Sequence, residues 1–212
     1  MEPESFEVGK SIITLVDHGA GNLRSVQKAL QAVGANVVLT SDPEIICSAQ
    51  KVVLPGVGAF ADVMQGLSKR NLVEIIKEVV KDQTPLLGIC VGMQMLFQVS
   101  EEHGEHDGLG LIRGRVCRFE PGKLKIPQTG WNEIHPAATT PLLQELDHNS
   151  YAYFNHSYYC LPEVETDVMA YTHYGFRYAS VVGRDKLYGA QFHPEKSQQV
   201  GLKILRNFVE LC

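Results

Sequence analysis

The 212-residue sequence has little of several features that mark specialised protein classes. Only 20% of its residues are charged and its net charge is -5, so no global basic field would attract nucleic acid or an anionic membrane. No hydrophobic run approaches the length of a membrane span, and there is no internal repeat or low-complexity tract. We therefore expect an ordinary soluble globular chain, with no nucleic acid and no membrane among its partners.

Cysteine is scarce and widely spaced. The five cysteines are odd in number and form no C-x-x-C pair, which argues against a disulfide framework and a zinc knuckle. A reducing cytoplasm is the simplest compartment. Residues 1–10 lack the basic start and apolar middle of a signal peptide, so we expect a loose tail there. Residues 11–212 are expected to form one domain, because this length can bury a sufficient core.

Strand and helix patterns alternate through the first half, which is typical of a parallel sheet with crossover helices. Strand-like runs lie at 11–16, 36–40, 51–54 and 85–87, the last of them leading to Cys90. Helical spacing lies at 23–33 and 43–48, and at 67–80 for one or two helices. Short aromatic and β-branched segments at 115–119, 151–156, 168–173, 178–182 and 187–192 predict mixed or antiparallel strands. A closing amphipathic helix is predicted at 197–211. The sequence thus predicts an α/β fold with a mostly parallel central sheet, helices on both faces and an added antiparallel region.

A cysteine stands at the centre of a glycine-flanked turn. The segment 88–92 reads Gly-Ile-Cys-Val-Gly, between a strand-like run and the helix-compatible residues 93–97. A residue at the tip of such a turn is strained and pushed outward, and its flanking glycines let backbone pass closely. The helix N-terminus that follows favours a thiolate. We interpret Cys90 as a nucleophile; the alternative is a small buried thiol in a Gly-rich turn.

A base with an orienting carboxylate follows another strand-like run. His193-Pro194-Glu195 places two functional groups two residues apart, on one side of the chain if the strand at 187–192 continues through them. An isolated His-x-Glu is usually a surface loop. Because Cys90 and His193 both follow apolar strands, and ligands bind at the carboxyl ends of parallel strands, we pair them as nucleophile and base.

A third strand breaks at residues 55–58, Pro-Gly-Val-Gly. Glycine permits unusual dihedral angles, so this loop is our candidate for backbone N–H groups that hold an oxyanion, although most Pro-Gly segments are simply turns.

Two other motifs are set aside. The pair His103 and His106 is interpreted as part of a solvated loop rather than a metal site. Gly19-x-Gly21 lacks the third glycine and the acidic residue of a dinucleotide loop.

Several blocks together resemble one enzyme family. Residues 88–94 with residues 192–197 resemble the class I (triad) glutamine amidotransferases. Within them, the chain resembles the glutaminase subunits of imidazole glycerol phosphate synthases, through the blocks at 17–23, 54–60, 130–132 and 155–158. The resemblance implies a flavodoxin-like fold, no metal and no organic cofactor. It also implies a separate (β/α)₈-barrel cyclase as the partner in a heterodimer.

The resemblance also implies residue roles. The catalytic triad would be Cys90, His193 and Glu195. The oxyanion hole would be formed by Gly56 and Val57. The substrate glutamine would contact Gly58, Gln94, His156, Ser157 and Tyr158. The docking face for the cyclase would include Asn22, Trp131, Asn132 and Lys196. The chain departs from the family pattern at His18, Ala59, Arg113, Gln128 and Thr129, which affects the docking face rather than any catalytic group.

The implied reaction is hydrolysis of glutamine to glutamate and ammonia through a thioester. The ammonia would pass to the cyclase, which makes imidazole glycerol phosphate and the carboxamide by-product AICAR in histidine biosynthesis. Three alternatives remain open. They are a triad glutaminase of another pathway, such as pyridoxal phosphate synthesis, a related cysteine peptidase or hydrolase, and a non-catalytic scaffold.

Overall fold

The computed structural model describes residues 11–212 except residues 20, 121, 123 and 148. The tail expected at 1–10 lies outside the described residues. One hydrophobic core includes buried side chains from Ile13 near the start of the described chain to Val209 in the last helix. The described part therefore shares a single core, within which the order of the strands decides which loops meet.

The first half of the chain forms the parallel part of the main sheet. Neighbouring strands run in the order β2 (Asn36–Thr40), β1 (Ile12–Val16), β3 (Val52–Gly56), β4 (Leu86–Cys90) and β14 (Leu187–Ala190). Strands β3, β4 and β14 are buried at every residue, as expected for parallel strands covered on both faces. The predicted strands are confirmed, but β3 continues two residues further than predicted, through Pro55 and Gly56.

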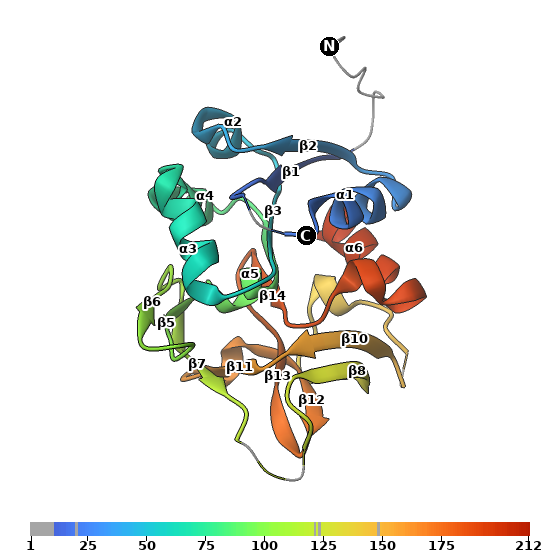
Figure 1. The fold of residues 1–212 in the computed structure, drawn as a ribbon. Helices are drawn as coiled ribbons and strands as arrows, with labels where there is room; N and C mark the ends of the chain where they lie inside the picture. Colours follow the sequence, from blue (N-terminus) through green and yellow to red (C-terminus); the bar gives the residue numbers. More distant parts are fainter. Residues whose placement is uncertain (1–10, 20, 121, 123, 148) are drawn as a thin grey trace.

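Helices cover both faces of this parallel part (Figure 1). Helices α1 (Leu23–Ala32) and α6 (Gln198–Leu211) pack on one side, and α2 (Pro43–Cys47), α3 (Phe60–Lys69) and α4 (Leu72–Lys81) pack on the other. Local signals explain their ends. The Asp42 carboxylate accepts from the Glu44 N–H at 2.9 Å at the start of α2, and Gly34 follows α1 with φ +96°.

The second half adds the antiparallel region. From β14 the sheet continues through β13 (Phe176–Arg184), β11 (Tyr158–Pro162), β7 (Ile112–Arg118), β5 (Phe97–Ser100) and β6 (His106–Asp107). Strand β12 (Val168–Tyr174) also pairs with β13, and β9 (His135–Pro136) pairs with β12. A separate two-stranded ribbon pairs β8 (Gln128–Glu133) with β10 (Tyr151–His156). The predicted antiparallel region is confirmed, although the sequence pattern missed β5, β6, β8, β9 and β11.

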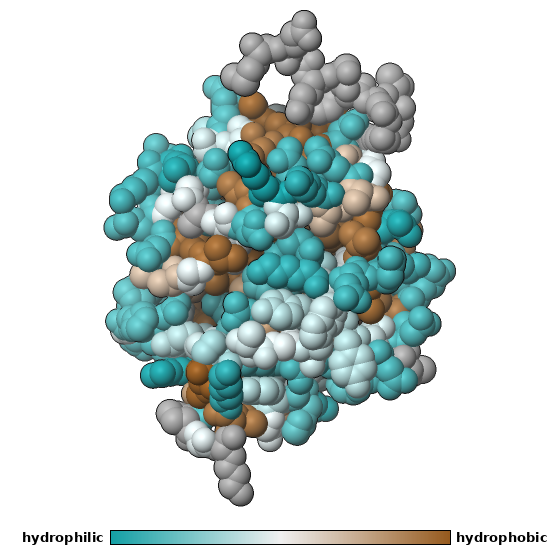
Figure 2. Space-filling model, turned by 45° about the vertical axis from the view of Figure 1, so that its right-hand side comes forward, coloured by the Kyte–Doolittle hydropathy of each residue, from teal (hydrophilic) through white to brown (hydrophobic). Residues whose placement is uncertain are grey.

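Short helical turns connect the strands near their ends. Helix α5 (Val91–Gln94) is a single turn, and residues 97–100, predicted as helix-compatible at Phe97, form β5. Three 3₁₀ turns lie at Pro141–Leu143, Glu165–Asp167 and Pro194–Lys196. Among the described residues, no helix is long and apolar enough to cross a membrane. On the face in Figure 2, hydrophilic side chains separate the hydrophobic ones into patches.

Candidate active site

Cys90 occupies the strained tip between β4 and α5. Its backbone has φ 56° and ψ -111°, a conformation that a residue with a side chain rarely adopts. The flanking glycines are required by close packing. A Cβ on Gly88 would lie 2.6 Å from the Gly92 carbonyl oxygen, and a Cβ on Gly92 would lie 2.0 Å from the Leu54 carbonyl oxygen. The elbow conformation expected from Gly-x-Cys-x-Gly is therefore confirmed.

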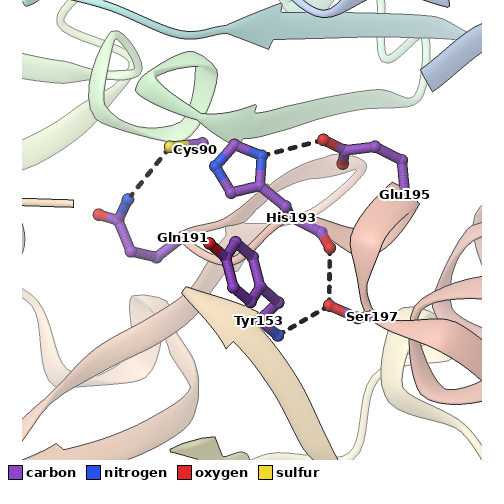
Figure 3. A network of polar contacts seen from close by, with 6 residues as sticks. All are labelled: Cys90, Tyr153, Gln191, His193, Glu195 and Ser197. Carbon is purple, nitrogen blue, oxygen red and sulfur yellow. Dashed lines mark hydrogen bonds and ion pairs between the residues drawn. The ribbon is translucent and has the colours of Figure 1, made fainter. Parts of the chain in front are cut away.

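His193 and Glu195 form a buried pair beside the cysteine. The His193 Nδ1 lies 3.0 Å from Glu195 Oε1, and both side chains are almost fully buried. In Figure 3, His193 lies between Glu195 and the Cys90 sulfur, with its other ring nitrogen toward the sulfur. The strand alternation expected to align this pair is wrong, because β14 ends at Ala190. A 3₁₀ turn at Pro194–Lys196 brings the carboxylate back to the ring instead.

The surroundings favour a protonated imidazole. Burial lowers the pKa of His193, but hydrogen bonds to Cys90 and Glu195 and the charges of these two groups outweigh burial and raise that pKa to about 10. An imidazolium can donate a proton to a leaving group. The pair is thus arranged as an ion pair between Glu195 and a cationic ring that faces the cysteine.

Backbone contacts hold His193 in place (Figure 3). The His193 N–H donates to the Tyr153 carbonyl at 2.9 Å. The Ser197 hydroxyl donates to the His193 carbonyl at 2.6 Å and accepts from the Tyr153 N–H at 2.9 Å. The ring is therefore anchored to β10 of the ribbon as well as to its own turn.

A cavity of about 400 Å³ lies over the cysteine. It collects most of the predicted site residues: Asn22, Val57, Gly58, Cys90, Gln94, His156, Ser157, Tyr158, His193 and Lys196. The structure does not bring Gly56, Trp131, Asn132 or Glu195 to its wall. A larger cavity of about 610 Å³ is lined by residues between 133 and 149 and contains none of the predicted site residues. The smaller cavity is the candidate site, because it contains both the cysteine and the histidine.

The loop after β3 lies against the elbow. Gly56 is opposite Cys90 in the β3–β4 register, and a Cβ on Gly56 would lie 2.6 Å from the Gly92 nitrogen. Glycine at 56 is therefore explained by close approach rather than by the unusual dihedral angle expected for it. The unusual dihedral angle occurs instead at Gly58, where φ is +96° and nothing lies within 4 Å of the place that a Cβ would take.

The family of the chain follows from a comparison over nearly its whole length. A family model described as "Glutamine amidotransferase class-I" matches residues 14–212. The chain belongs to this family. Two relatives are both called "Imidazole glycerol phosphate synthase subunit HisH". The relative from Salinibacter ruber is 47% identical over 204 residues, covering 93% of this chain and 94% of its own length. The relative from Syntrophotalea carbinolica is 48% identical over 206 residues, covering 94% and 100%.

Solved structures with lower identity share the fold of this amidotransferase. PurLQS from Thermotoga maritima has a TM-score of 0.74 at 17% identity, and the match covers 94% of this chain and 97% of that chain. A structure called glutamine amidotransferase has a TM-score of 0.73 at 18% identity, covering 93% and 97%. The predicted class I amidotransferase fold is confirmed.

The expected substrate residues form a hydrogen-bonded group in this amidotransferase. The Tyr158 carbonyl accepts from Gln94 Nε2 at 3.1 Å and from His156 Nδ1 at 2.7 Å. Burial lowers the pKa of His156 to about 4, with the charge of His193 acting in the same direction and the hydrogen bond to Tyr158 opposing it. His156 is therefore neutral, and its one ring proton is used on Tyr158. The side chains of Gln94 and His156 thus fix the backbone at Tyr158.

Three residues near the cysteine were missed by sequence reasoning. Glu102 lines the cavity, and its carboxylate accepts from the Phe60 N–H at 2.6 Å at the start of α3. Gln191 Nε2 lies 3.9 Å from the Cys90 sulfur. The Tyr153 ring lies beside His193, with centroids 6.4 Å apart. The sequence marks these residues only by their position. Gln191 lies in the 187–192 run directly before His193, and Glu102 directly precedes the loop of His103 and His106.

Two of the predicted docking residues, Trp131 and Lys196, contact the Tyr153 ring. The Trp131 ring meets the Tyr153 ring edge to face at 6.1 Å, and Lys196 Nζ lies 5.8 Å from the centre of the same ring. Trp131 is 45% exposed, a large share for an indole. Asn132 follows on β8, and Asn22 reaches the wall of the cavity. Asn22 and Lys196 therefore line the cavity, whereas Trp131 and Asn132 lie on β8 and are not part of its wall.

The departures from the family pattern have identifiable places. The His18 Nε2 donates to the Pro55 carbonyl at 2.7 Å, directly before Gly56. Ala59 supplies no side-chain cap to α3, and Glu102 caps that helix instead. Gln128 donates to Asn132 Oδ1 at 2.9 Å, and Thr129 donates to Asn155 Oδ1 at 3.1 Å. The Arg113 carbonyl accepts from the Glu163 N–H at 3.1 Å, and Arg113 does not line the cavity over Cys90.

The histidines of the 103–106 loop do not form a metal site in the part of the chain that is described. No group of three or more His, Cys, Asp or Glu side chains in that part is arranged to hold a metal ion. The expectation that the chain needs neither a metal nor an organic cofactor stays a prediction.

Proposed function

We propose that this chain is the glutaminase subunit of an imidazole glycerol phosphate synthase and that it hydrolyses glutamine to glutamate and ammonia. The observation that carries the proposal is the buried His193–Glu195 pair, 3.0 Å apart, facing a strained cysteine. The chain's relatives at 47% and 48% identity, which are called HisH subunits of that synthase, support the pathway.

Cys90 is the nucleophile in this proposal. Its thiolate attacks the side-chain amide carbon of glutamine, and the negative oxygen is held by N–H groups of the Gly56–Val57 segment. When the tetrahedral intermediate collapses, His193 donates a proton to the departing nitrogen, which leaves as ammonia. A glutamyl thioester remains on Cys90. Glu195 keeps the His193 ring oriented throughout.

Water completes the cycle. The now neutral His193 removes a proton from a water molecule that attacks the thioester carbonyl. The carbon–sulfur bond breaks, glutamate forms, and the thiolate returns with its proton on His193. The chain needs no redox step and no external base in this sequence.

The amino-acid end of glutamine needs partners for both of its charges. Glu102 supplies a carboxylate at the cavity wall, where it can pair with the substrate's α-ammonium group. The backbone at His156, Ser157 and Tyr158 is the candidate partner for the α-carboxylate, together with Gln94. The Gly58 backbone lines the same cavity. These contacts would select a free amino acid over a peptide. A cysteine peptidase would lack this selectivity.

The ammonia leaves toward a (β/α)₈-barrel cyclase in this proposal. The proposed docking face includes Trp131, Asn132, Lys196 and Asn22. Trp131 and Lys196 contact the Tyr153 ring, and Asn22 and Lys196 line the cavity. The cyclase would then make imidazole glycerol phosphate and AICAR.

We also propose a cytoplasmic location, since all five cysteines are free.

The deciding experiment separates ammonia production from ammonia use. Cys90→Ala in a complex with the barrel subunit should abolish glutamine-dependent synthesis of imidazole glycerol phosphate, because the covalent route is gone. Synthesis from added ammonium salt should continue at the wild-type rate. Continued glutamine hydrolysis by the variant would overturn the assignment of Cys90. A barrel subunit that neither binds the chain nor uses its ammonia would overturn the pathway.

A further inference from the structure

Gln191 contacts the cysteine sulfur from a side that the triad does not use. It is completely buried just beyond β14, two residues before His193. Its Nε2 lies 3.9 Å from Cys90 Sγ, and its Oε1 accepts from Gln94 Nε2 at 3.2 Å. Figure 3 shows Gln191 and His193 approaching the sulfur from different sides. The sulfur therefore has a second polar neighbour besides the histidine.

The orientation of the Gln191 amide is determined by its surroundings. The Tyr158 carbonyl can only accept, so Gln94 must turn its NH₂ group toward it at 3.1 Å. The same NH₂ group then faces Gln191, and the atom that it meets must be the Gln191 oxygen. The Gln191 NH₂ group is left facing the sulfur. A backbone carbonyl thus orients two successive amides.

We propose that Gln191 is a further catalytic residue, whose side-chain amide donates a hydrogen bond to the Cys90 sulfur and stabilises its thiolate form. This inference rests on the proposed function, in which Cys90 is the nucleophile. In this proposal Gln94 is a positioning residue, because it orients the Gln191 amide and acts on the sulfur only through Gln191.

The thiolate needs this donor because other stabilisation is limited. Cys90 is only 4% exposed, and a buried anion is costly unless it is hydrogen-bonded. Helix α5 has four residues, Val91–Gln94, so few aligned peptide dipoles point at the sulfur. His193 supplies charge from one side, and Gln191 supplies a neutral donor from the other.

The donor acts at two stages of the reaction. It stabilises the thiolate before attack on glutamine. A thioester sulfur is a much poorer acceptor than a thiolate, so the hydrogen bond weakens on acylation and strengthens again as hydrolysis expels the sulfur. Gln191 therefore favours the sulfur as leaving group in the second step as well as its ionised form before the first.

The test is the pH dependence of Cys90 alkylation by iodoacetamide in the full chain. The peptide that contains Cys90 is quantified by mass spectrometry, because the chain has four other free cysteines. In Gln191→Met, which keeps the length and apolar contacts of the side chain, the midpoint should rise by about one pH unit. At a pH below the midpoint, a shift of one unit makes alkylation of the variant roughly tenfold slower than that of the wild type. The kcat for glutamine should fall about tenfold, with KM changed less than twofold.

A matched control is Ser180→Ala on the adjacent strand. The Ser180 carbonyl accepts from the Gln191 N–H at 2.9 Å, but its buried hydroxyl has no partner among the described residues. The substitution perturbs packing beside Gln191 without removing a donor to the sulfur. Its alkylation midpoint should match that of the wild type. An equal shift in both variants would overturn the proposal, because it would reflect packing alone.

A second variant covers the case in which Gln191→Met fails to fold. Gln94→Met leaves Gln191 in place but removes the donor that orients it, so the midpoint should rise by a smaller amount. An unchanged or lower midpoint in a folded variant of either kind overturns the role of Gln191. That outcome is distinguishable from failure of the proposed function, in which Cys90→Ala would retain glutamine hydrolysis.

Discussion

The parallel part of the main sheet and the separate β8–β10 ribbon contribute different parts of the candidate site. Strands β4 and β14 of the parallel part lead into Cys90 and His193, and every residue of both strands is buried. The ribbon strand β10 alternates between exposed and buried residues and ends at His156. In the proposed function, the buried part carries the groups that make and break bonds. The half-exposed ribbon carries groups proposed to face the substrate and the docking partner.

The two parts also hold their histidines in opposite protonation states. The pKa of His193 is raised to about 10, because its contacts with Cys90 and Glu195 outweigh burial. The pKa of His156 is lowered to about 4, chiefly by burial. Burial acts on both rings, so the difference lies in their neighbours. Cys90 and Glu195 keep the buried His193 ring protonated, whereas the hydrogen bond from His156 to the Tyr158 carbonyl is too weak to offset burial and leaves that ring neutral.

The largest expected effect concerns the acid–base pair. His193→Ala should lower kcat by about 10⁴-fold, because the proton donor to ammonia is lost. Glu195→Gln should cost less, since a neutral acceptor can still orient the ring. Steady-state release of glutamate with the barrel partner present measures both. Equal losses would mean that Glu195 takes a direct chemical part.

A second effect probes the close packing of the parallel part. In Gly92→Ala the new Cβ would lie 2.0 Å from the Leu54 carbonyl oxygen, so β3 and the elbow must separate. We expect a loss of about 4 kcal/mol in the free energy of unfolding, measured by urea denaturation. Gly122→Ala is the control, because nothing lies within 4 Å of its Cβ position. A stable Gly92→Ala protein with a normal elbow would show that this packing is not a constraint.

A third effect separates the two histidines by pH. His156 has a depressed pKa of about 4, so the unfolded chain, with a value near 6.5, binds more protons between these values. Stability therefore falls as the pH drops from 6.5 toward 4, by about 3 kcal/mol from this residue. His193 has a raised pKa, so its contribution is complete below pH 6.5 and is lost as the pH rises through about 10.

The pH effect is measured by comparing variants with the wild type. His156→Gln keeps a donor for Tyr158 and removes the titrating ring, so its unfolding free energy should fall less between about pH 7 and pH 4. His193→Gln should differ from the wild type mainly on the alkaline side. If both variants diverge from the wild type in the same pH range, the two sites do not hold opposite protonation states.

The smallest effect lies on the ribbon. Trp131→Ala should weaken binding of the barrel partner by about 2 kcal/mol, because a 45% exposed indole beside Tyr153 is well placed as an anchor. Isothermal titration with the purified partner measures the change. Tyr151→Ala is matched to it, since Tyr151 is 47% exposed on the paired strand β10. Comparable losses in both variants would enlarge the docking face to the whole ribbon.

Much of the parallel part could be predicted from the sequence. The boundaries of β2 and the cap of α2 follow from residues within a few positions of one another. The elbow was predictable for the same reason, because Gly88 and Gly92 act on the backbone next to Cys90. The five missed strands lie outside the parallel part formed by β2, β1, β3, β4 and β14, and short segments such as β6 and β9, two residues each, depend on pairing rather than on their own pattern.

The sequence by itself determined the groups that share a local segment: the strained cysteine, the loop after β3, and the spacing of His193 and Glu195. Only the tertiary structure decided how those groups are used. The 3₁₀ turn, not a continued strand, brings Glu195 to His193. Gln191 meets a cysteine 101 residues away, and Glu102 caps a helix 42 residues away. The Gln191–Cys90 contact follows from the position of β14 beside β4, and strand order depends on burial of the whole core rather than on any local pattern.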